Sequence, residues 1–173
     1  MEELLSQVLI RDKPTESQED WDGLSRAWNA PIPSGYIQFM SWYGAGEFGD
    51  YMSILSPVRD LATDADYGMA FETQNAQSDW EDEDREKFSS PPSTHPRLIC
   101  WAVSSDANMY CWDLDDPGGP IYVYHRLGDV WNTYQLSISE FIAGLISESI
   151  PGYLDSGHAE VFDWEIPLRY IQA

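Results

Sequence analysis

Four short segments rich in aromatic and β-branched residues follow one another between residues 98 and 136. They are Leu98–Val103, Met109–Leu114, Pro120–His125 and Asp129–Leu136. The turn from Asp115 to Gly119 between the second and third segments has the Asp, Pro and Gly residues that favour tight reversals. Connections this short cannot return a strand in parallel, so the segments predict an antiparallel meander around which the chain must fold.

A helix is predicted over residues 34–43, ahead of the meander. Tyr36, Phe39, Met40 and Tyr43 recur at i, i+3, i+4 and i+7, which places them on one apolar face. Pro33 favours an extended approach, and Ser34 is expected to cap the first free N–H groups. Gly44 supplies the left-handed stop, and Gly46 and Gly49 predict a pliable loop after it.

Further helices and strands are indicated by apolar periodicity and by capping residues. The expected helices are Glu2–Ile10, Thr15–Asn29 with a Thr15–Gln18 capping box, 58 to about 74, and one that begins at Ser137 with Glu140 completing a capping box. The expected additional strands are Tyr51–Ser56 and, near a sheet edge, Phe162–Ile166. Helices that flank a meander predict one α+β domain over residues 1–173, with helices packed around a twisted, mainly antiparallel sheet.

The formal net charge is −21, from 30 acidic residues against 9 Lys and Arg. Such a charge repels nucleic acid and anionic membranes, whereas it attracts basic proteins. The alternative is that the acids only keep the protein soluble or reflect a salt-rich environment. The sequence has no apolar run of eighteen residues, and its first residues are acidic, so neither a membrane span nor a secretory signal is predicted. We therefore expect a cytoplasmic protein.

Residues 79–86 form the most acidic stretch, with six acids among eight residues. Trp80 lies within this stretch, where a large ring suits an interface anchor because the neighbouring acids steer a partner towards it. The alternative is a solvated face whose one ring folds back on the core. The residues proposed to contact a partner are Asp79, Trp80, Glu81, Asp82, Glu83, Asp84 and Glu86, with Glu47, Asp50, Asp115 and Asp116 as a second set.

Motifs for a cofactor, a metal or catalysis are weak in this sequence. Residues 44–49 match G-x-G-x-x-G, but the predicted helix precedes the glycines, whereas a dinucleotide site needs a strand before them and a helix after. Asp113, Asp115 and Asp116 resemble the start of a calcium loop, but Tyr124 occupies the position that needs a bidentate Glu. We expect no cofactor, no metal and no enzymatic activity.

The remaining reactive side chains are two cysteines and three histidines. Cys100 and Cys111 lie on two neighbouring predicted strands, so a cross-strand disulfide or two buried free thiols are both open, and a cytosolic chain favours the thiols. His95, His125 and His158 are isolated from one another and lack the spacing of a zinc site.

Three blocks of this sequence resemble the SUKH superfamily. Pro33, Tyr36, Phe39 and Gly44 match the first block, although the chain has Gly44-Ala45-Gly46 where the family often has Asn-Gly-Gly. The second block has Asp113 at the end of a strand and Pro120 at the start of the next. The matching positions of the third block are Ser137, Phe141 and Leu145. The resemblance covers about residues 15–147 and leaves residues 148–173 as a C-terminal extension.

The resemblance implies a fold and a function. It implies an α+β domain without enzymatic activity, because members are mostly bacterial immunity proteins that neutralise secreted polymorphic toxins, many of them nucleases. The remaining members are regulatory binding proteins. The resemblance therefore predicts a cognate toxin domain as the partner, and the acidic composition favours a basic one. The alternative is a regulatory or scaffold module without a toxin. The oligomeric state stays open.

Overall fold

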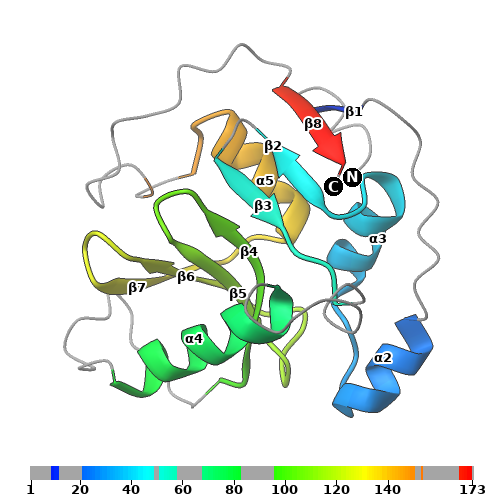
Figure 1. The fold of residues 1–173 in the computed structure, drawn as a ribbon, viewed down its shortest axis with the longest axis vertical. Helices are drawn as coiled ribbons and strands as arrows, with labels where there is room; N and C mark the ends of the chain where they lie inside the picture. The colour runs from blue at the N-terminus through cyan, green and yellow to red at the C-terminus, as the bar shows by residue number, and fades with distance from the viewer. Residues whose placement is uncertain are drawn as a thin grey trace.

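The computed structural model describes residues 9–11, 21–48, 51–57, 68–82, 96–150, 153 and 168–172. Within these residues, eight strands form one sheet in the order β1-β8-β2-β3-β4-β5-β6-β7, accompanied by four helices (Figure 1). Every neighbouring pair is antiparallel except β1 and β8, which run parallel. The expected α+β architecture with a mainly antiparallel sheet is therefore confirmed.

The predicted meander is present. Its strands are β4 (Leu98–Ser104), β5 (Met109–Asp113), β6 (Ile121–His125) and β7 (Val130–Tyr134). Strand β3 (Met52–Ile54) pairs with β4, as Ile54 lies opposite Ala102. All five residues of β5 and all five of β6 are buried, because helices cover both faces of the sheet at this point.

The other end of the sheet differs from the sequence-based expectation. Leu9 and Ile10 belong to a strand, β1 (Leu9–Arg11), rather than to a helix. The expected glycine loop begins as β2 (Gly46–Phe48), because β3 and β8 both provide backbone partners for it. The C-terminal extension contributes β8 (Leu168–Gln172), which lies between β1 and β2 and not at an edge. The predicted strand at 162–166 lies outside the described residues.

Helices α3 (Ser34–Trp42) and α5 (Ile138–Ile146) pack over one face of the sheet. Tyr36 and Phe39 of α3, Phe141 of α5 and Trp101 of β4 are completely buried in the core between them. Helix α2 (Trp21–Trp28) adds Trp21, Leu24 and Trp28, which are half-buried against the same core. The expected capping box at 15 and 18 lies outside the described residues.

The ends of α3 and α5 test the predicted caps. Ser137 and Glu140 form the expected capping box at the start of α5. At α3, however, the capping position is Pro33 and no side chain caps the helix, so the role predicted for Ser34 is wrong. Gly44 has a φ of 73°, which confirms the left-handed stop. The described part of the G-x-G-x-x-G stretch follows helix α3 and itself contains strand β2, whereas a dinucleotide site needs a strand before the glycines and a helix after them.

Helix α4 (Met69–Asp82) covers the opposite face of the sheet (Figure 1). It continues beyond residue 74, where the predicted helix ended, and residues 58–67 lie outside the described part. The side of α4 that faces the sheet has the helical spacing of Met69, Thr73, Ala76 and Trp80. Because a polar and a small residue are among these four, apolar periodicity alone did not predict the helix over its full length. No helix within the described ranges combines the length and the apolar character needed to cross a membrane.

Candidate protein-binding surface

The free edge of β4 fixes the position of α4. Strand β3 accompanies β4 only as far as the bond from the Leu55 N–H to the Trp101 carbonyl. Beyond this point, side chains of α4 replace the missing strand: the Cys100 N–H donates to Thr73 Oγ1 at 3.0 Å, and Gln77 Nε2 donates to the Leu98 carbonyl at 3.0 Å. Since buried backbone groups need partners, these bonds define how α4 lies on the sheet.

Trp80 of α4 packs against the sheet. Its ring meets Tyr122 and Trp131 edge-on, with centroid distances of 5.6 and 5.1 Å. The side chain is half-buried against a second core cluster, which includes Ala76, Cys100, Cys111 and Trp131. The ring therefore folds back on the core, as the alternative interpretation of the acidic stretch expected, while one part of its surface stays exposed.

The acids of the first predicted set occupy the C-terminal part of α4 and the residues after it. Asp79 forms an ion pair of 3.1 Å with Arg126, which follows β6. Glu81 is exposed, and Asp82 ends the helix. Glu83, Asp84 and Glu86 lie outside the described residues. Asp79 therefore connects the C-terminal part of α4 to the turn between β6 and β7, which contains Arg126.

The acids of the second set are not brought together. Asp115, in the β5–β6 turn, accepts two hydrogen bonds of 2.5 and 2.8 Å from the guanidinium of Arg97, which directly precedes β4. The hydrogen bond from Arg97 lowers the pKa of the Asp115 carboxyl. Asp116 is exposed in the same turn. Glu47 is exposed on β2, which β3 and β4 separate from β5. Asp50 lies outside the described residues.

The aspartates that resemble a calcium loop have a structural role. Asp113 Oδ1 accepts hydrogen bonds from the N–H groups of Arg97 and Asp115, both at 3.0 Å. This carboxylate therefore organises the β5–β6 turn and the start of β4. Among the residues that the structure describes, no three His, Cys, Asp or Glu side chains gather as a metal site would require.

The β6–β7 turn, residues 126–129, is a feature that the sequence analysis missed. The guanidinium of Arg126 lies 4.9 Å from the Tyr124 ring centroid, and the Tyr124 hydroxyl donates to Asp129 Oδ1 at 2.6 Å. Leu127 stands between them with 80% of its surface exposed. A leucine in a short polar turn was the available signal, since such turns usually carry Gly, Asn, Asp or Ser.

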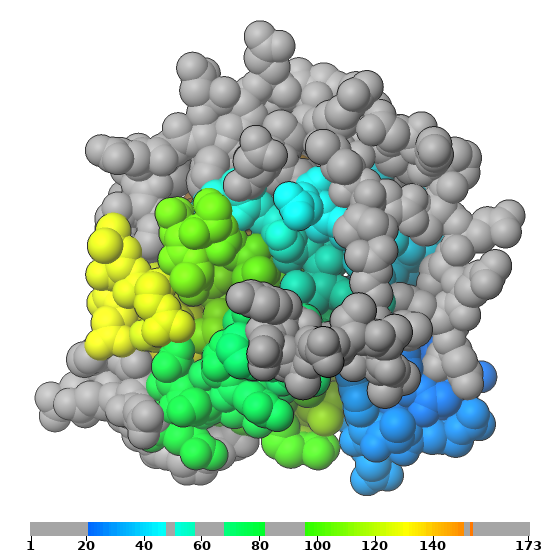
Figure 2. All heavy atoms as spheres, in the orientation of Figure 1, coloured from blue at the N-terminus to red at the C-terminus, as the bar shows by residue number. Residues whose placement is uncertain are grey.

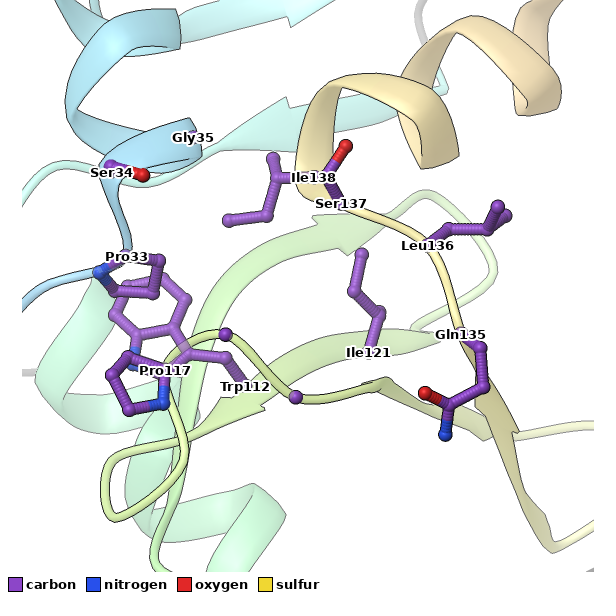
Figure 3. A pocket seen from close by; sticks show the side chains of 12 residues that line it. Pro33, Ser34, Gly35, Trp112, Pro117, Ile121, Gln135, Leu136, Ser137 and Ile138 are labelled. Atoms are coloured by element: carbon purple, nitrogen blue, oxygen red, sulfur yellow. The ribbon is translucent and has the colours of Figure 1, made fainter.

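A shallow hollow of about 250 Å³ lies where the first turns of α3 and α5 meet the β5–β6 turn (Figure 3). Its lining residues are Pro33, Ser34, Gly35, Trp112, Pro117, Gly118, Gly119, Ile121, Gln135, Leu136, Ser137 and Ile138. None of these twelve is an Asp, Glu, His, Lys, Cys or Tyr. The hollow therefore lacks the acid–base pair on which hydrolytic chemistry depends.

Cys100 and Cys111 are buried free thiols that lie directly opposite each other on β4 and β5, as the cytosolic interpretation predicted. Burial raises the pKa of the Cys111 thiol, and a hydrogen bond with Cys100 adds to the increase. His125 is completely buried, with its ring 5.3 Å from that of Tyr153. His95 and His158 lie outside the described residues. The described thiols and histidine are thus packed inside the fold and not placed at a surface.

Comparison with known proteins identifies a family. A search of curated protein sequences finds no match to this chain. The model of the SMI1 / KNR4 family (SUKH-1) matches residues 15–144, which include α2 to α4, the first turns of α5 and strands β2 to β7. Strands β1 and β8, which pair at one side of the sheet, lie outside the match. The protein belongs to the SMI1 / KNR4 family (SUKH-1).

Proposed function

We propose that this protein is an immunity protein that binds the C-terminal domain of a cognate polymorphic toxin and blocks it. Membership of SUKH-1 supports a binding role, because the resemblance implies mostly immunity proteins. The observation that carries the proposal is the acidic surface on α4, a helix that Thr73, Gln77 and Trp80 attach to the sheet. Glu81 and the C-terminal end of α4 lie there, on a molecule with a net charge of −21.

The partner that best fits this surface is a basic nuclease domain. A nuclease attracts phosphate, so its active cleft carries positive charge. An acidic protein docked in that cleft excludes nucleic acid and needs no chemistry of its own. Complementary charge also accelerates the encounter, which matters for an inhibitor that must reach the toxin before the toxin reaches its substrate.

The ion pairs separate the acids into two groups with different expected roles. Asp79 and Asp115 each face an arginine of the same chain, so part of their charge is already balanced. Glu81, Asp116 and Glu47 are exposed. We expect Glu81, together with Glu83 and Asp84, to provide most of the attraction for a basic partner, while Asp79 mainly positions the β6–β7 turn.

The first test is a tagged pull-down from the native organism, with bound proteins identified by mass. The expected result is a large secreted protein captured through a basic C-terminal domain that is toxic when produced alone and harmless when produced with this protein. Recovery of only housekeeping proteins would overturn the toxin assignment and favour a regulatory or scaffold module.

A second test measures association of that purified toxin domain with charge-reversed variants. The variant with both Glu81→Lys and Asp84→Lys should associate with the toxin domain about tenfold more slowly than the wild type at low salt, and the difference should be much smaller at high salt. The matched control is Asp22→Lys together with Glu148→Lys, which changes the net charge equally at exposed positions outside α4. Equal slowing by both variants would indicate attraction by the whole molecule and would reject α4 as the docking surface.

A further inference from the structure

The β6–β7 turn presents an apolar side chain that folding leaves outside the core. Leu127 is 80% exposed and is the one large hydrophobic residue found exposed within the described ranges. A single exposed leucine is common on protein surfaces. This one, however, stands at the end of a hairpin whose neighbouring side chains are all held in place.

Four interactions hold the turn. The Arg126 N–H donates to Asn108 Oδ1 at 3.0 Å, which ties the turn to the residue before β5. The Arg126 side chain lies against the Tyr124 ring and reaches Asp79 of α4. Asp129 accepts a hydrogen bond from Tyr124 and has a left-handed φ of 48°, which fixes the return of the chain. A turn held this way loses little entropy on binding.

The β6–β7 turn and the part of α4 that the Asp79–Arg126 ion pair joins to it contain residue types that are common at interface centres. Arg126 and the half-buried Trp80 belong to the residue types that most often dominate binding energy. The acids Asp79, Glu81 and Asp129 lie on the two segments that the ion pair joins, and because Arg126 balances only one of them, the rim stays negative. Figure 2 shows the β6–β7 segment in yellow directly beside α4 in green on one face of the molecule.

We infer that Leu127 is the apolar anchor of the docking surface, and that its occupant is a basic protein domain with an apolar depression at the centre of its positive surface. The inference rests on the proposed function and specifies where the toxin domain docks. Charge complementarity selects the occupant, because an acidic rim around an apolar anchor disfavours a second copy of this acidic chain. The sequence analysis offered Trp80 as an anchor beside the alternative that its ring folds back on the core, and the ring lies against Tyr122 and Trp131.

The anchor and the rim make different kinetic contributions. The apolar contact of an anchor stabilises the complex and must be broken before the two proteins separate. Replacing the anchor therefore raises koff. Rim charges act at long range, so replacing them lowers kon and changes the salt dependence. This division gives the inference a measurable signature beyond weaker binding.

The test is a surface-binding measurement of the purified toxin domain recovered in the pull-down above. Leu127→Ser should raise Kd about tenfold or more, mainly through koff, and leave kon within about twofold. Glu81→Lys should act mainly on kon. The control is Gly118→Ser in the opposite turn of β6, where an added Cβ meets no atom within 4 Å. Since Leu127 is exposed, the thermal midpoint of Leu127→Ser should equal that of the wild type.

The outcomes separate the two proposals. Unchanged affinity of Leu127→Ser for a toxin domain that the wild type binds would overturn the anchor assignment and leave the immunity function intact. Failure of the wild type to bind any toxic domain would overturn both. If Gly118→Ser weakened binding as strongly as Leu127→Ser, the β5–β6 turn would be part of the contact, and the anchor assignment would be wrong.

Discussion

The ring of Trp80 on α4 meets the ring of Trp131 on β7 edge-on, with centroids 5.1 Å apart. This contact joins the acidic stretch to the far strand of the meander. It also explains how a tryptophan can occur among acids without being fully exposed: Glu81 is exposed on α4, whereas the neighbouring indole lies over Tyr122 and Trp131. The same contact holds α4 next to the β6–β7 turn.

Trp80→Ala should therefore lower the free energy of unfolding. We expect a loss of about 2 kcal/mol, below the usual cost for a fully buried tryptophan because the ring is half-exposed. Urea unfolding monitored by circular dichroism measures the change, and Trp80→Phe should recover part of it. A stability equal to that of the wild type would show that the contacts of the indole with Tyr122 and Trp131 do not stabilise the fold.

Thr73→Val tests the side-chain bonds that attach α4 to β4. Valine keeps the shape of threonine but removes the oxygen that accepts from the Cys100 N–H. An unsatisfied backbone donor at this partly buried site should cost about 1–2 kcal/mol. Thr73→Ser, which keeps the hydroxyl, is the conservative control, and the two should differ in urea unfolding. Equal destabilisation by both variants would contradict the assignment, because Thr73→Ser keeps the hydroxyl that accepts from the Cys100 N–H and loses only the methyl group.

Ser34 at the start of α3 and Ser137 at the start of α5 can be compared to measure what a capping side chain contributes to stability. Ser137→Ala removes the capping box of α5 and should cost about 1 kcal/mol of stability. Ser34→Ala should be close to neutral, because no side chain caps α3. Thermal unfolding of both variants checks the difference. A neutral Ser137→Ala would mean that packing of the apolar face of α5 alone determines where the helix starts.

The capping box also predicts a pH dependence. Hydrogen bonds from the Ser137 hydroxyl and N–H lower the pKa of Glu140 in the folded protein. A carboxyl whose pKa is lower in the folded than in the unfolded state stabilises the fold above its unfolded pKa. This stabilisation should disappear as pH falls below the unfolded pKa of Glu140 and through its lower folded pKa. Glu140→Gln should remove this part of the acid-side slope in unfolding measured from pH 3 to pH 6, and an unchanged slope would contradict the assignment.

The thiols of Cys100 and Cys111 should be unreactive in the native protein. Both are completely buried, and the raised pKa of Cys111 reduces its thiolate fraction at neutral pH. A thiol reagent should modify neither cysteine in native buffer within the time in which both react in urea. Rapid native labelling would show that α4 opens from the sheet, since α4 packs over this pair. Labelling of Thr73→Val provides the comparison, because that variant weakens the attachment of α4.

Local patterns in the sequence were sufficient for the meander, α3 and α5. The strands β4 to β7 have apolar segments separated by compact turns, and α5 has both a capping box and an apolar face. Such features depend on residues a few positions apart, so they can be read without knowledge of the fold.

The sequence by itself determined the fold class, the meander, the family resemblance and the negative charge. Only the tertiary structure decided that residues 9–11 are a strand, that β8 lies inside the sheet, and that α4 continues to Asp82. It also decided that Arg126 pairs with Asp79 and that Leu127 stays outside the core. The physical reason is that these features depend on partners distant in sequence. A three-residue strand forms because another strand provides its hydrogen bonds, and a leucine is exposed because its neighbours, and not its own chemistry, complete the core.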